Sequence, residues 1–377
     1  MSKPKYITSL TRVPELSEEE QQALAQVTDQ FDFRSNDYYQ QLINWDDPDD
    51  PIRRLIMPDR QELNDWGDLD PSGEESYVKV KGLEHKYSPT ALLLCSDVCA
   101  GYCRYCFRKR LFMRDNDEIE KDVSLGVQYI AEHPEIINVL LTGGDPLILS
   151  TSRLRTIFEQ LRAIPHVRII RIGTKFPAFN PYRIVDDPEL LQLIRDYTLP
   201  DKKIYIMTHF DHPRELTDVA LAGIQALLNA GAIVQNQNPI ISGINDSPEV
   251  LVELWNKLSA AGVTPYYLFQ CRPTMGNATY TIPIERALAI FEEARSRTSG
   301  LAKRVRYMLS HRTGKIEICG MTESLIFFKY HSAAQRENDG RMLIFERNPD
   351  AAWLDDYTEM VDTHVISSDL QAHHTAA

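Results

Sequence analysis

The sequence predicts an α/β protein whose centre is a partial (β/α)6 barrel, similar to a TIM barrel but with fewer strands. Two observations predict this fold. From residue 91 onward, short apolar runs alternate with longer amphipathic stretches, which is typical of βα units around a parallel sheet. Six such runs can be counted, whereas a closed barrel has about eight strands. The sheet is therefore expected to be a partial barrel with extensions before and after it.

The composition excludes several classes of protein. Of the 377 residues, 43% are hydrophobic and 25% are charged, which is the usage of an ordinary globular chain. The formal net charge of −13 argues against nucleic acid and anionic membranes as partners and favours a small molecule. The sequence has no apolar run of the roughly 18 residues that a membrane span needs, and its first residues lack the apolar core of a signal peptide. We expect a cytoplasmic protein.

Three regions follow one another along the chain. Residues 1–85 are polar and helix-prone, and Ser17 and Glu20 have the spacing of a capping box, so an N-terminal helical region is expected. Residues 86–297 are expected to form the barrel. Residues 298–377 form a less regular C-terminal region with two strand-like runs.

Strands and helices are expected to alternate regularly in the barrel. The expected strands are 91–94, 137–141, 168–172, 203–207, 232–235 and 266–269, and the expected helices are 119–133, 151–163, 186–197, 214–230, 247–261 and 283–297. In parallel sheets, functional residues lie at the carboxyl ends of strands. After Cys95, those ends read TGGD at 142–145, GTK at 173–175, THF at 208–210, NQN at 236–238 and QCR at 270–272.

Three cysteines, Cys99, Cys103 and Cys106, form a CxxxCxxC motif directly after the first expected strand. This spacing lets three thiolates from one loop hold three corners of a cubic iron–sulfur cluster, so that the fourth iron stays open for a substrate or cofactor. A structural zinc site with Cys95 as the fourth ligand is the alternative. Zinc ligands, however, usually come as two pairs separated by a longer stretch.

The motif resembles that of the radical S-adenosylmethionine (SAM) superfamily, in which an aromatic residue, here Tyr105, precedes the last cysteine. From about Tyr38 to Leu354, the sequence further resembles the lysine 2,3-aminomutase family. The segments that carry this resemblance are LLLCSDVCAGYCRYCFRKR, LTGGDPL, IPHVRIIRIGT, THFDHPRE, NQNPIISGIND and PYYLFQC. The resemblance implies a partial barrel of the radical SAM type.

The resemblance also implies a 4Fe–4S cluster on the three cysteines. Its open iron would bind SAM, and its electron would cleave SAM to a 5′-deoxyadenosyl radical. Glycines at a strand end let the backbone approach a ligand closely, whereas the polar residues, each taken alone, could equally be structural caps. The residues expected to position SAM are Tyr105, Gly143, Gly144, Asp145, His209, Asn236 and Gln237.

Aminomutases of this family also use pyridoxal phosphate (PLP) bound to a lysine. The segment RTGKI at 312–316 resembles the family's glycine-rich turn, with its glycine run reduced to one residue, and Lys315 is the candidate lysine. In HKY at 85–87, Lys86 replaces a phosphate-binding arginine and lacks bidentate geometry. Thr90 stands where a second basic residue is frequent, which would weaken the phosphate site.

Two arginines are candidate substrate-binding residues. Arg108 resembles the family's carboxylate-binding arginine. Lysine mutases bind the distant ammonium with two aspartates, and this chain has Arg272 at one place and Met308 or a neutral neighbour at the other. A cation there would repel lysine at a cost on the order of several kcal/mol. Arg272 suits a side-chain carboxylate, so a glutamate-like substrate is predicted. A rim arginine paired with an acidic residue is the alternative.

The leading hypothesis is a radical SAM, PLP-dependent 2,3-aminomutase, an isomerase that moves the amino group of an α-amino acid to the β-carbon. A second hypothesis keeps the radical chemistry without PLP. A third is a zinc-stabilised binding protein. The resemblance further implies an electron donor such as flavodoxin or ferredoxin and a homo-oligomer, with no nucleic-acid or membrane partner.

Overall fold

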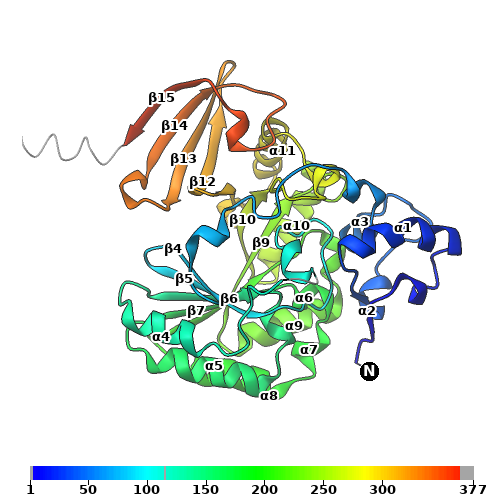
Figure 1. Ribbon diagram of the computed structural model, residues 1–377, viewed down its shortest axis with the longest axis vertical. Helices are drawn as coiled ribbons and strands as arrows, with labels where there is room; N and C mark the ends of the chain where they lie inside the picture. The colour runs from blue at the N-terminus through cyan, green and yellow to red at the C-terminus, as the bar shows by residue number, and fades with distance from the viewer. Residues whose placement is uncertain (1–2, 114–115, 366–377) are drawn as a thin grey trace, which may run out of the picture.

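The computed structural model describes residues 3–113 and 116–365, and six parallel strands form its centre (Figure 1). These strands neighbour one another in chain order, and each overlaps the range that the sequence predicted. The predicted partial barrel is therefore confirmed. The strands are β5 (Thr90–Ser96), β6 (Asn138–Gly143), β7 (Ile169–Thr174), β8 (Lys203–Thr208), β9 (Ile233–Ile240) and β10 (Thr264–Gln270).

Six helices connect or follow these strands, and each lies within its expected range. Side chains cap several N-termini, as Ser150 and Ser247 do by accepting bonds from backbone N–H groups at the start of their helices. No helix of the described residues is long and apolar enough to cross a membrane. The helices are α4 (Ser124–Glu132), α5 (Thr151–Ala163), α8 (Pro188–Tyr197), α9 (Asp218–Asn229), α10 (Pro248–Ala260) and α11 (Ile284–Ser296), with the short α6 (Phe176–Phe179) and α7 (Tyr182–Val185) before α8.

Alternate residues of the parallel strands point to opposite faces of the sheet. In β7, Ile170 and Ile172 are fully buried in the core that the helices share, while Arg171 between them is half-buried on the other, concave face. Residues in register across parallel strands point to the same face, so one row of side chains lines the concave face. This row consists of Leu92, Leu140, Arg171 and Tyr205.

The N-terminal region contains the expected helices and four short strands that were not expected. Ser17 and Glu20 form the predicted capping box of α1 (Glu18–Gln30), with reciprocal bonds of 3.2 and 2.9 Å. The antiparallel strands β3 (Val78–Val80) and β4 (Leu83–Tyr87) extend the sheet beyond β5. Their pairing covers the backbone edge that β5 would otherwise expose. The other elements are β1 (Tyr6–Ile7), β2 (Ser35–Asn36), α2 (Asp37–Gln40) and α3 (Pro51–Ile56).

The C-terminal region is more regular than the sequence indicated. Its first strand is parallel to β10, and four antiparallel strands continue the same sheet, drawn in orange to red in Figure 1. Register shifts interrupt the alternation of side chains in three of these strands, which hid the pattern from the sequence. The strands are β11 (Arg306–His311), β12 (Gly314–Met321), β13 (Leu325–Ala333), β14 (Arg341–Glu346) and β15 (Met360–Val365).

Candidate active site

The loop after β5 carries the three cysteines of the motif, all of them free thiols. The backbone N–H of Arg108 donates to Cys106 Sγ at 3.4 Å, which is a bond that suits a thiolate. Among the described residues, no three His, Cys, Asp or Glu side chains gather as ligands of one metal ion. A cubic cluster has a different requirement, since its three thiolates bind three different irons. Cys99 interacts electrostatically with Cys103 and Cys106, so the three thiols lie near one another, as a cluster held by this loop would require.

A buried set of charges connects this loop to the N-terminal region. Arg104, between two of the cysteines, forms a bidentate pair with Glu62 at 2.9 and 2.8 Å. Lys109 binds the same carboxylate at 3.1 Å. The three side chains are at most 5% exposed, so water does not screen these pairs. They fix the cysteine loop against residues that lie far away in the sequence.

Two glycines at the end of β6 let this strand pack against the cysteine loop. The N–H of Gly144 donates to Ser96 O at 2.6 Å. A Cβ on Gly144 would lie 2.5 Å from Val98 O, and one on Gly143, whose φ is +108°, would lie 2.4 Å from Ser96 O. Glycine is required here by the packing of backbone on backbone. A role of these glycines in binding SAM remains a prediction.

Asp145 is buried and its carboxylate already has several partners. It accepts bonds from the N–H of Leu147 at 3.0 Å, the hydroxyl of Thr174 at 2.9 Å and the N–H of Lys175 at 2.7 Å. Burial raises its pKa to about 6. In this structure, Asp145 joins the end of β6 to the end of β7, and its contact with SAM remains a prediction.

Tyr105 and His209, both predicted site residues, come together at the ends of the strands. The Tyr105 hydroxyl lies 2.9 Å from His209 Nε2 and donates to Asp211 at 2.5 Å. Lys175 donates to Asp211 at 2.6 Å and also pairs with Glu215 at 2.8 Å. Burial alone would raise the pKa of Asp211, but the Lys175 ammonium outweighs it and holds that pKa well below its usual range.

The sequence analysis missed Lys175, Asp211 and Glu215 as members of this network. The signal was present, because Lys175 stands in the GTK segment at a strand end and the other two stand in THFDHPRE. Their role could not be assigned from the sequence, since only folding shows that the side chains meet behind Tyr105.

Asn236 braces the loop that carries His209. Its amide accepts from Phe210 N–H at 2.8 Å and donates to Phe210 O at 3.1 Å. Gln237, the next residue of β9, is half-buried and in register with Tyr267 of β10. The structure thus places Asn236 against the loop that carries His209, and it places Gln237 beside Tyr267 of β10.

A second group of predicted residues surrounds Lys315 at the start of β12. Lys315 Nζ lies 4.6 Å from the centre of the Tyr267 ring and 5.3 Å from that of Phe269. Burial, assisted by the cations Arg171, Arg272 and Lys86, lowers the pKa of Lys315 to about 7. Such a lysine is neutral in an appreciable fraction at neutral pH, so it fits a cofactor aldehyde.

The hairpin before Lys315 needs only one glycine. Gly314 has a φ of +155°, and a Cβ there would lie 2.5 Å from Ser332 O of the neighbouring strand. The other turn residues are exposed. Lys86 donates to His311 O of the same hairpin at 2.7 Å. The reduced glycine run is therefore compatible with a lysine held at this place.

Arg272, directly after β10, has no ion-pair partner among the described residues. Its guanidinium stacks on the Phe107 ring at 3.5 Å, beside Cys106. Nη1 is buried and has no hydrogen-bond partner in that part of the chain. Burial lowers the pKa of Arg272 to about 10, so it is still a cation at neutral pH. A buried, unpaired guanidinium is suited to an anionic ligand.

Arg108, by contrast, is already bound within the protein. Glu74 accepts from its Nε at 3.0 Å and its Nη2 at 2.8 Å, and Thr142 accepts from its Nη1 at 2.8 Å. Arg110 also binds Glu74, at 2.7 Å. The sequence gave no sign of this partner, which lies 34 residues earlier. Binding of a substrate carboxylate by Arg108 remains a prediction.

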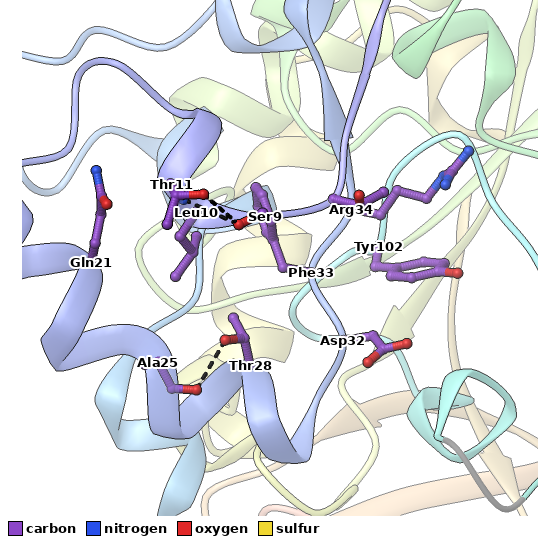
Figure 2. A pocket seen from close by; sticks show the side chains of 11 residues that line it. Ser9, Leu10, Thr11, Gln21, Ala25, Thr28, Asp32, Phe33, Arg34 and Tyr102 are labelled. Atoms are coloured by element: carbon purple, nitrogen blue, oxygen red, sulfur yellow. Dashed lines mark hydrogen bonds between the residues drawn. The ribbon is translucent and has the colours of Figure 1, made fainter.

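A pocket of about 480 Å³ lies between the N-terminal region and Tyr102 of the cysteine loop (Figure 2). Of the motif segment, it shares only Tyr102, and the predicted site residues do not line it. Its lining is polar and comes mostly from the N-terminal region. The lining residues are Thr8, Ser9, Leu10, Thr11, Gln21, Ala25, Thr28, Asp32, Phe33, Arg34 and Tyr102.

Comparison with known proteins gives close relatives, although no family model matches the chain. A protein of Aquifex aeolicus named "Putative L-lysine 2,3-aminomutase" is 56% identical over 95% of this chain and 96% of its own. The L-lysine 2,3-aminomutase of Clostridium subterminale is 36% identical over 78% of this chain and 70% of its own. The glutamate 2,3-aminomutase of Clostridioides difficile is 34% identical over 78% of this chain and 69% of its own. A solved radical SAM methyltransferase from Sphaerobacter thermophilus aligns over 60% of this chain and 68% of its own, at 19% identity and a TM-score of 0.39, too loosely to carry an argument.

The open barrel, the cysteine loop and these relatives define the class, which is that of the radical SAM isomerases. More narrowly, the chain belongs to the lysine 2,3-aminomutase family. The family uses a 4Fe–4S cluster, SAM and PLP. The hypothesis of a zinc-stabilised binding protein is therefore wrong, because the relatives are radical SAM isomerases. That hypothesis used Cys95 as the fourth zinc ligand. Cys95 is buried in the hydrophobic core, with its thiol directed to Thr142 O at 3.7 Å.

Proposed function

We propose that this protein is a PLP-dependent 2,3-aminomutase for an acidic amino acid, with glutamate as the preferred substrate. Family membership alone does not choose the substrate, because the family includes a glutamate 2,3-aminomutase that is 34% identical to this chain beside a lysine 2,3-aminomutase that is 36% identical, and the 56% identical relative carries its lysine name only as putative. The observation that carries the proposal is the buried, unpaired guanidinium of Arg272 on the Phe107 ring. A substrate ammonium would meet a like charge there, whereas a carboxylate would gain a charge-assisted bond.

The charge around Lys315 supports the same substrate. Lys86, Arg171, Arg272 and Lys315 form no ion pair among the described residues. The phosphate of PLP and the side-chain carboxylate of glutamate would bring negative charge to Lys86, Arg171 and Arg272, whereas the side chain of lysine would bring a further cation. Buried charges are stable only when they are paired. The side chain of glutamate therefore pairs with a buried cation of the site, and that of lysine does not.

The cluster and SAM supply the radical, and PLP carries the amino group while it moves between neighbouring carbons. The chain's own residues would hold and orient these groups. Cys99, Cys103 and Cys106 would bind the cluster, Lys315 would bind PLP, and Arg272 would bind the side-chain carboxylate of the substrate. An electron donor such as flavodoxin or ferredoxin, a homo-oligomeric assembly and a cytoplasmic location complete the proposal.

Product formation from glutamate, aspartate, alanine and lysine tests the substrate. Reduced, reconstituted wild type should convert glutamate best and lysine hardly at all. Arg272→Lys should keep part of the activity, although a misplacement of about 1 Å relative to the radical could cost roughly a hundred-fold. Arg272→Asp should lose activity on glutamate. The matched control is Arg286→Asp, at an exposed arginine of α11.

Efficient conversion of lysine by the wild type would contradict the proposal. So would Arg272→Asp with unchanged selectivity among the four amino acids.

A further inference from the structure

Arg171 is a cation to which neither the sequence motifs nor the proposed function assigns a ligand. It lies in the middle of β7 on the concave face, in register with Leu140 and Tyr205. Its Nε donates to the side-chain oxygen of Asn138 at 2.9 Å. It forms no ion pair within the described residues. The bond to Asn138 holds one edge of the guanidinium and leaves the two Nη groups available for a ligand.

Arg171 lies close to the position at which this sequence lacks a basic residue. Asn138, its hydrogen-bond partner, is the Cα partner of Thr90 in the β5–β6 ladder. Residues in register point to the same face, and both are half-buried. The guanidinium of Arg171 is therefore separated from Thr90 only by Asn138 on the same face of the sheet, close to where the family resemblance led us to expect a second cation for the cofactor phosphate.

Arg171 also belongs to the surroundings of Lys315. After burial, Arg171 is the strongest influence that lowers the pKa of Lys315. Arg171 interacts electrostatically with Tyr266 and Tyr267, and Lys315 Nζ lies 4.6 Å from the Tyr267 ring. The two cations thus lie near the same aromatic pair.

We infer that Arg171 binds the phosphate group of PLP and supplies the guanidinium that Lys86 and Thr90 do not provide. A phosphate dianion is bound best by a planar fork of donors, which lysine and threonine lack. Lys86 donates to His311 O in the hairpin that carries Lys315, so it adds a second positive charge near this lysine. This inference concerns the cofactor and does not depend on which amino acid is the substrate.

Binding of PLP and of pyridoxal, which lacks the phosphate, tests the inference. Anaerobically reconstituted protein is titrated with each aldehyde, reduced with borohydride, and the label on the Lys315 peptide is quantified by mass spectrometry. Arg171→Gln should weaken binding of PLP by roughly 10- to 100-fold, the usual value of a charge-assisted bond, and leave pyridoxal nearly unchanged. Arg171→Lys should restore part of the difference. Any effect of the substitution on Lys315 itself cancels in the ratio of the affinity for PLP to the affinity for pyridoxal, because both aldehydes bind the same lysine.

The matched control is Arg168→Gln, at the exposed arginine just before β7 that pairs with Asp201. It should change neither affinity. Equal weakening of PLP and pyridoxal in Arg171→Gln would overturn the inference and show that Arg171 acts only through Lys315 or the fold. Unchanged PLP affinity with a raised KM for glutamate would assign Arg171 to a substrate carboxylate instead. Absence of label on Lys315 in the wild type would overturn it as well.

Discussion

At the scale of single residues, the reactivity of Lys315 depends on its surroundings. A lysine in water has a pKa of about 10.4 and is almost fully protonated at neutral pH. Burial and three nearby cations lower the pKa of Lys315 to about 7. Only the neutral amine attacks an aldehyde, so this environment prepares the lysine for PLP. Two of these cations, Arg171 and Lys86, would also receive the cofactor's phosphate in our proposal.

The pH dependence of PLP attachment should reflect this pKa. Lys315 is protonated below its pKa, so the attachment rate should rise as the pH rises through about 7 and then level off. The measurement is borohydride trapping on the Lys315 peptide between pH 5 and pH 10, values chosen to bracket the lowered and the ordinary lysine pKa. Lys315→Ala should abolish trapping, and Lys329→Ala, at a half-buried lysine of β13, should not. A midpoint near 10, or trapping on another lysine, would contradict the assignment.

At the scale of elements, the loop after β5 combines ligands and packing. Its three cysteines hold the cluster in our assignment, while Cys95 and Cys271 are buried structural residues, 4% and 1% exposed. Three thiolates suffice for a cluster with one open iron. Replacing any one of Cys99, Cys103 or Cys106 with Ala should abolish iron binding and SAM cleavage. Iron content after anaerobic reconstitution and the release of 5′-deoxyadenosine measure the two effects.

Cys95→Ala and Cys271→Ala are the controls of this experiment. Each removes a small buried group at a modest cost in stability and should leave cluster content largely intact. Loss of iron in Cys95→Ala would show that the ligand set is wrong.

Gly144→Ala tests how far the cluster depends on the packing of β6 against this loop. The new Cβ would lie 2.5 Å from Val98 O and 2.7 Å from Val98 N, so the loop must shift. We expect reduced iron incorporation with a retained overall fold, measured by iron analysis beside circular dichroism. Gly300→Ala is the control, because no atom lies within 4 Å of its added Cβ. Full iron content in Gly144→Ala would show that the close approach is dispensable.

At the scale of the whole molecule, buried ion pairs connect the N-terminal region to the barrel. Glu62 holds Arg104 and Lys109 of the cysteine loop, and all three are buried. Removing one partner of such a set leaves uncompensated charges in the interior. The N-terminal region is thus part of the site's support, although most of its helices lie outside the barrel (Figure 1).

Glu62→Gln should lower the free energy of unfolding by about 3–5 kcal/mol, measured by urea denaturation at pH 7. Burial alone would raise the pKa of Glu62, but Arg104 and Lys109 lower it below its ordinary value. The stabilisation is therefore present above the unfolded pKa of about 4.3 and lost as the pH falls through the lower folded value. Glu253→Gln, in an exposed pair on α10, should cause no measurable change. Equal stabilities of Glu62→Gln and wild type would contradict this account.

The sequence by itself determined the local features. The capping box of Ser17 and Glu20 located α1, helical periodicity located α5 and α10, and six apolar runs located the parallel strands, because these signals lie within a dozen neighbouring residues. The CxxxCxxC spacing identified the cysteine loop, since its three thiolates are close along the chain. Strand-end segments placed Tyr105 and His209 near one mouth, because the carboxyl ends of parallel strands meet at one edge.

Only the tertiary structure decided the features that join distant segments. Glu74 binds Arg108 across 34 residues, and Arg272 meets Phe107 rather than an acidic partner, and no local pattern encodes either contact. Of the strands from β11 to β15, the sequence indicated only two, and bulges interrupt the alternation in three of the five. No sequence motif assigned a role to Arg171. Only the strand register shows that it bonds to Asn138, which pairs with Thr90. Strand pairing, and therefore the position of each charge on the concave face, depends on the whole sheet.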